Sequence, residues 1–74
     1  MNTEKLRTEL DNCEDGFEWL VAALIYSDLP WSHPLKGCAY LTYRGTFKCS
    51  RRDVLALIEY LELEQKEVQD AQQA

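Results

Sequence analysis

The chain has 74 residues, an apolar fraction of 46% and a formal net charge of −5. This length allows one small domain, residues 1–74, and the ordinary apolar content argues against disorder over most of it. The longest apolar run, Trp19 to Tyr26, falls well short of the ~20 residues that span a bilayer. We therefore expect a cytoplasmic protein without a membrane segment.

The first predicted element is one helix over residues 3–27, capped by Thr3 and bent at Asp15–Gly16. Two helices broken at that point are the alternative. Apolar residues three and four positions apart form a seam, which is typical of a helix packed on a partner. The seam is therefore expected to form the core or to hold a homodimer together. It contains Leu6, Leu10, Cys13, Phe17, Leu20 and Leu24. Pro30 predicts the end of the helix.

A β-hairpin is expected next. Residues 39–43 and 46–49 favour strands, and Arg44–Gly45 between them resembles a two-residue turn. In this register one face of the hairpin, expected to pack on the helices, carries Tyr40, Thr42, Phe47 and Cys49. The expected fold class is thus α+β, mainly helical, in the order α-β-β-α.

The last predicted element is a second helix. Ser50 and Asp53 have the spacing of a capping box, so the helix should begin there. Its apolar stripe is expected to contain Val54, Leu57, Ile58 and Leu61. After that stripe few apolar residues follow, so residues 64–74 are expected to be an exposed or fraying helical tail.

Residues able to ligate metals or act as nucleophiles are sparse. The single histidine, His33, and three cysteines, Cys13, Cys38 and Cys49, lack the close pairing of zinc sites. The cysteines are expected to be reduced. Cys49 precedes a predicted helix N-terminus and two arginines, which can lower the pKa of a thiol. The chain is nevertheless too short to enclose a substrate, so we expect no enzyme, no cofactor and no metal.

Charge is segregated along the chain. Residues 29–52 contain no Asp or Glu and sum to +5, whereas residues 1–28 and 53–74 each sum to −5. Such segregation bears on partners rather than on a reaction. We therefore expect a small acidic regulator or inhibitor that binds a larger protein stoichiometrically, a type of protein that phages and mobile elements encode. Its expected partner-binding residues are Trp31, Tyr43, Arg44, Lys48, Arg51 and Arg52.

The alternative is a nucleic-acid-binding accessory protein that uses the basic, aromatic segment 31–52. Bases stack on aromatic rings while cations meet phosphates, which favours this interpretation. The net charge of −5 repels polyanions and weighs against it.

Overall fold

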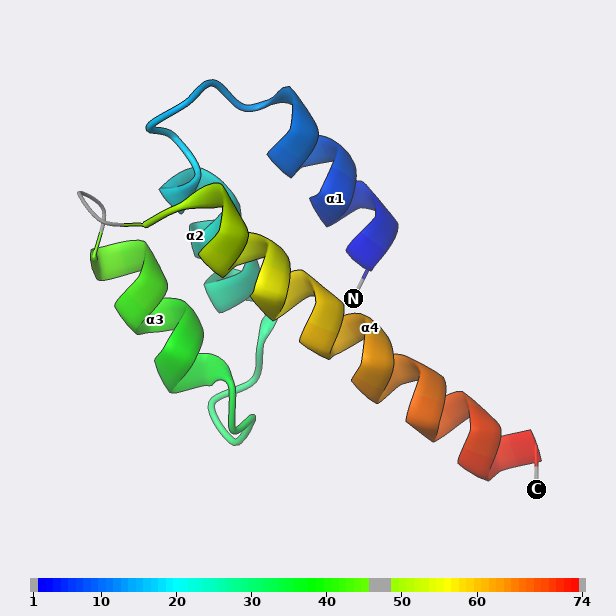
Figure 1. Cartoon of the computed structure of the whole chain (residues 1–74). Coiled ribbons are helices and arrows are strands. Elements are labelled where there is room, and N and C mark those ends of the chain that lie inside the picture. The colour runs from blue at the N-terminus through cyan, green and yellow to red at the C-terminus, as the bar shows by residue number, and fades with distance from the viewer. Residues whose placement is uncertain (1, 46–48, 74) are drawn as a thin grey trace.

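The regular elements of the described chain are all α-helices. The computed structural model describes residues 2–45 and 49–73, with side chains as far as Glu67. The helices are α1 (Thr3–Asn12), α2 (Trp19–Asp28), α3 (Lys36–Arg44) and α4 (Arg51–Gln73), shown in Figure 1. No strand occurs in these residues, so the predicted α+β class and the α-β-β-α order are wrong.

Helix α4 organises the fold. It runs diagonally across the molecule, with α1 along one side, α3 along the other and α2 behind it (Figure 1). Its 23 residues give a length of about 34 Å, most of the 43 Å long axis of the molecule. The C-terminal half of α4 extends past the other helices, so the predicted tail is helical in its backbone as far as Gln73.

The predicted first strand lies inside α3. Lys36, Ala39 and Tyr43 are spaced by three and four residues and turn toward the interior, with Ala39 fully buried. This helical spacing outweighs the strand preference of Tyr40 and Thr42, which depends on a pleated surface to pack against. Residues 46–48 of the predicted second strand, Phe47 included, lie outside the described residues.

The predicted helix over residues 3–27 is two helices, so the alternative is correct. Helix α1 ends at Asn12, and Gly16 has a φ of +95°, which L-residues rarely adopt. The N-cap is also one residue earlier than expected, because the Oδ1 of Asn2, rather than Thr3, accepts a bond from the Lys5 N–H. Helix α2 ends at Asp28, as Pro30 predicts.

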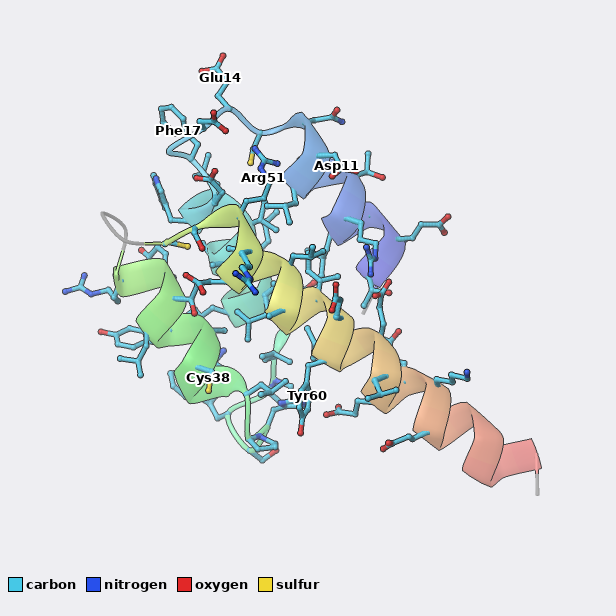
Figure 2. The ribbon with its side chains drawn as sticks, in the orientation of Figure 1. Asp11, Glu14, Phe17, Cys38, Arg51 and Tyr60 are labelled. Carbon is cyan, nitrogen blue, oxygen red and sulfur yellow. The ribbon has the colours of Figure 1, made fainter. Side chains whose placement is uncertain are left out.

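The break divides the predicted seam. Leu6 and Leu10 are buried in the core, and Cys13 is half-buried beside it. The remaining seam residues are about half exposed, and they are Phe17, Leu20 and Leu24. Figure 2 shows Phe17 on the connection between α1 and α2. The core itself contains Leu6, Leu10, Val21, Ala22, Ile25, Leu29, Ala39, Val54, Ile58 and Leu61.

The start of α4 follows the prediction. The Oδ2 of Asp53 accepts bonds from the N–H and hydroxyl of Ser50, and the Asp53 N–H donates to the Ser50 hydroxyl. This capping box places Val54 and Ile58 in the core, where both are fully buried.

Candidate functional site

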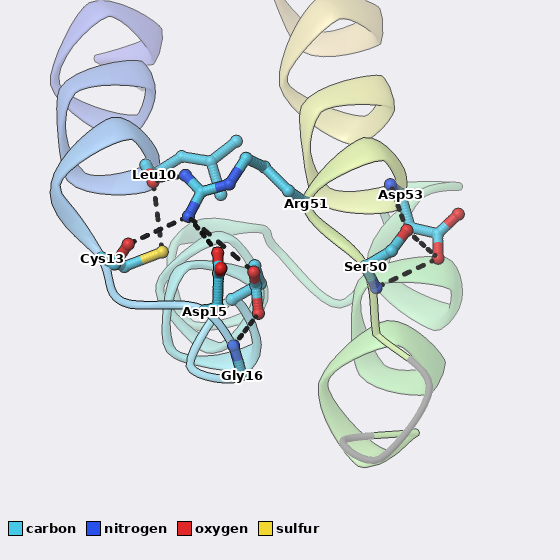
Figure 3. Close-up of polar contacts among 8 residues, drawn as sticks. Leu10, Cys13, Asp15, Gly16, Ser50, Arg51 and Asp53 are labelled. Atoms are coloured by element: carbon cyan, nitrogen blue, oxygen red, sulfur yellow. Dashed lines mark hydrogen bonds and ion pairs between the residues drawn. The ribbon is translucent and has the colours of Figure 1, made fainter.

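The side chain of Arg51 contacts the end of α1 and the connection between α1 and α2 (Figure 3). Its guanidinium donates to the carbonyl oxygens of Leu10 and Cys13, the latter at 2.9 Å. It also lies 3.5 Å from a carboxylate oxygen of Asp15 and 3.8 Å from one of Glu18. The carbonyls at the C-terminus of α1 thereby gain a cationic donor, which suits the negative end of the helix dipole.

The buried Glu18 completes this network. Only 6% of the residue is exposed, and its Oε2 accepts the Gly16 N–H at 2.9 Å. Arg51 is thus engaged by carbonyls and carboxylates of its own chain, and its guanidinium is committed to the fold.

The other predicted partner-binding residues are spread over the molecule. Trp31 is 83% exposed in the connection before α3, whereas Arg44 lies at the opposite end of that helix. Tyr43 is half-buried, with its ring 6.2 Å from that of Trp19. Arg52 is exposed on the first turn of α4. Lys48 lies outside the described residues.

An apolar groove lies between α3 and α4, beside the core stripe of α4. It is open to solvent, has a volume of about 510 Å³ and is lined by Leu35, Leu41, Thr42, Gly45, Cys49, Asp53, Ala56, Leu57 and Tyr60. Leu41 is 69% exposed and Tyr60 is 58% exposed, so both walls present large uncovered apolar side chains. Figure 2 shows Tyr60 on the side of α4 that faces the connection before α3.

The apolar surface continues beyond the groove along α4. A smaller hollow of about 160 Å³ is lined by Tyr60, Leu63, Glu64 and Glu67. Leu63 is 57% exposed. We call the groove and this hollow together the outer face of α4.

Sequence reasoning missed the outer face, although a signal for it exists. Asp53, Ala56, Tyr60, Leu63 and Glu67 recur every three or four residues, which defines one helix face. This second stripe is masked in the sequence by the more apolar core stripe.

The polar residues singled out for chemistry are used structurally. The Nε2 of His33 lies 2.8 Å from a carboxylate oxygen of Glu64, and its Nδ1 accepts the Leu35 N–H at 3.0 Å. Burial raises the pKa of the Cys49 thiol, with smaller contributions from Asp53 and Glu18, opposite to the lowering that its position suggested. In the part of the chain that the structure describes, no cluster of three such residues is placed to hold a metal ion.

Comparisons with known proteins give no match: no family model, curated protein or solved structure is significantly similar to this chain. Over the described residues, no helix combines the length and apolar character that crossing a bilayer requires.

Proposed function

We propose that this protein is a small acidic cytoplasmic regulator or inhibitor, which acts by binding another protein stoichiometrically through the outer face of α4. The observation that carries this proposal is the uncovered apolar surface there. Leu41, Tyr60 and Leu63 each expose more than half of their area, and they lie along one groove and its continuation. Contiguous exposed apolar surface rimmed by polar residues is typical of a protein-interaction site.

The chemistry of the outer face favours a basic amphipathic helix as the partner element. The described charged side chains that line the groove and its continuation are all acidic, namely Asp53, Glu64 and Glu67. The whole chain adds a net charge of −5. A helix with an apolar stripe and flanking lysines or arginines would bury the stripe in the groove and match the acidic rim.

The proposal is tested by titrating the protein with a designed amphipathic Leu/Lys helix of about 18 residues, long enough to fold on binding. Binding is measured by isothermal titration calorimetry. A peptide of the same pattern with Glu in place of Lys serves as the charge control and should not bind.

The decisive comparison is Leu41→Glu against Leu24→Glu. Both add one negative charge at an exposed apolar position, but only Leu41 lines the groove. Burial of a leucine contributes about 1.5–3 kcal/mol, so Leu41→Glu should weaken binding about tenfold or more despite its added attraction for lysine. Leu24→Glu should leave the affinity unchanged or slightly higher. Equal affinities for the two variants would show that charge alone attracts the peptide and would refute the proposal.

A homodimer remains a second proposal, now restricted to α2. Leu20 and Leu24 are half-exposed and lie four residues apart on α2, and the half-exposed Phe17 lies just before this helix begins. Two copies with a charge of −5 each repel one another, so association should strengthen between roughly 0.05 and 0.5 M NaCl as the charges are screened. Sedimentation velocity tests this, with Leu24→Glu expected to be monomeric and Leu41→Glu to behave as wild type. A wild-type protein that stays monomeric at high micromolar concentration and high salt would end this proposal.

A further inference from the structure

A second cavity lies between the end of α2 and the start of α3, away from the groove. It is open to solvent, has a volume of about 480 Å³ and is lined by Tyr26, Trp31, His33, Lys36, Gly37 and Tyr40. The rings of Tyr26 and Trp31 meet edge to face with centroids 6.2 Å apart, and Tyr40 lies 5.5 Å from Tyr26. Trp31 is 83% exposed, so the largest ring at the cavity keeps most of its surface uncovered.

Lys36 supplies this cavity with a buried cation. The residue is 9% exposed, and its ammonium donates to the carbonyl oxygens of Tyr26 and Leu29 at 2.5 and 2.8 Å. The nitrogen also lies 4.0 Å from the ring centroid of Tyr26 and 4.7 Å from that of Trp31. No carboxylate of the described chain pairs with it.

The ammonium of Lys36 is thus surrounded by two carbonyl groups and two aromatic rings, but among the described residues it has no ionic partner. A lysine has three N–H donors, and two of those of Lys36 are used by carbonyl groups. The negative end of the α2 dipole offsets only about half of a unit charge. A buried charge normally has an ionic partner, and the residues lining the cavity include no Asp or Glu.

We infer that this cavity binds a planar aromatic ring that carries an anionic group, in the form of a nucleobase with its phosphate. In this proposal the base stacks on the ring of Trp31, and a phosphate oxygen accepts a hydrogen bond from the third N–H of the Lys36 ammonium. The volume of the cavity lies within the range of small-ligand sites. The inference is independent of the function proposed for the outer face of α4.

The base–phosphate unit has two sources, a free mononucleotide or one unit of a single strand. The net charge of −5 repels a polyanion more than a single phosphate, which favours the mononucleotide. Titrations with AMP and with an oligothymidylate distinguish them. Tighter binding of the oligonucleotide, with steep salt dependence, would assign the cavity to single strands.

The test is calorimetric titration with AMP, adenosine and ribose 5-phosphate. AMP should bind about tenfold more tightly than adenosine, which lacks the anion, and ribose 5-phosphate should bind weakest because it cannot stack. Trp31→Ala should weaken AMP binding by at least about fivefold, since a base–aromatic stack is lost. Thr8→Ala, a neutral truncation at an exposed position on α1 outside the cavity, is the control and should leave AMP binding unchanged.

A variant at Gly37 separates a loss of AMP binding from a loss of folding. A Cβ at Gly37 meets no atom within 4 Å, so Gly37→Leu introduces a side chain at the cavity wall without a clash in its first atom. Leucine also favours the helix more than glycine, so the far-ultraviolet circular dichroism should be kept while AMP binding falls. No saturable AMP binding at millimolar concentration, equal binding of ribose 5-phosphate, or unchanged binding by Trp31→Ala would each overturn the inference.

Discussion

Replacing Arg51 by methionine tests how the broken first helix is held. The substitution keeps most of the aliphatic stem but removes the guanidinium that bonds to the carbonyls of Leu10 and Cys13. It also leaves the buried carboxylate of Glu18 without its cation. The loop between α1 and α2 should therefore lose its main link to α4.

The expected loss follows from these contacts. A hydrogen bond from a charged group contributes about 1.5–3 kcal/mol, and the lower end applies because the Arg51 side chain is 37% exposed. Two such bonds give about 3 kcal/mol. A cation in the first turn of α4 opposes the helix dipole, so its removal should stabilise the fold by about 0.3–1 kcal/mol. The net cost of Arg51→Met is then about 2–3 kcal/mol, out of a total stability of roughly 4–11 kcal/mol for a chain of this length.

Urea unfolding followed by circular dichroism measures this loss, and Arg52→Met is the matched control. Arg52 is exposed on the same turn and, among the described residues, makes no hydrogen bond or ion pair. Its replacement should leave stability unchanged or raise it by a few tenths of a kcal/mol, because only the dipole effect operates. If the two variants differ by less than about 0.5 kcal/mol, the role given to Arg51 is wrong.

Three further predictions concern single positions. Gly16→Ala should destabilise the fold by roughly 1–2 kcal/mol through backbone strain at its φ of +95°, measured by urea unfolding; an unchanged stability would contradict this. Iodoacetamide should label the exposed Cys38 faster than Cys49, whose pKa is raised by burial, and mass spectrometry of the labelled peptides would show the reverse order if that assignment fails. The hydrogen bond from Arg7 lowers the pKa of Glu62, so this pair stabilises the fold at neutral pH and loses its effect as the pH falls through the lowered pKa. Glu62→Gln should thus destabilise slightly at pH 7 and have no effect in strong acid, and an effect of the same size at both pH values would refute the pairing.

The sequence contains the local signals of this fold but not its long-range contacts. The capping box of Ser50 and Asp53 and the helix end before Pro30 depend on neighbouring residues, and both were predicted correctly. The prediction of one helix through Gly16 is wrong, because the bonds that stabilise the break come from Arg51, 35 positions away.

The hairpin prediction failed for a related reason. Tyr40 and Thr42 favour strands only when a neighbouring strand is present, whereas Lys36 and Ala39 follow a helical spacing that becomes decisive once α2 lies beside them. The burial of Lys36 against the carbonyls at the end of α2 depends on how α2 and α3 meet, which no local sequence signal specifies.

The expected partner-binding residues do not share one environment. Trp31 is exposed, whereas Arg51 is engaged internally. The outer face of α4 escaped notice because Tyr60 and Leu63 form a weaker stripe than the core residues between them.

Photo-cross-linking in the source organism tests the central proposal most directly. Benzoylphenylalanine introduced in place of Leu41, Leu63 or, as the control, Leu24 reports which face a partner occupies in the cell. We expect one predominant one-to-one adduct with another protein from the Leu41 and Leu63 positions, and none of that mass from the Leu24 position. The same adducts from all three positions, or no adduct from the outer face of α4, would contradict the proposal.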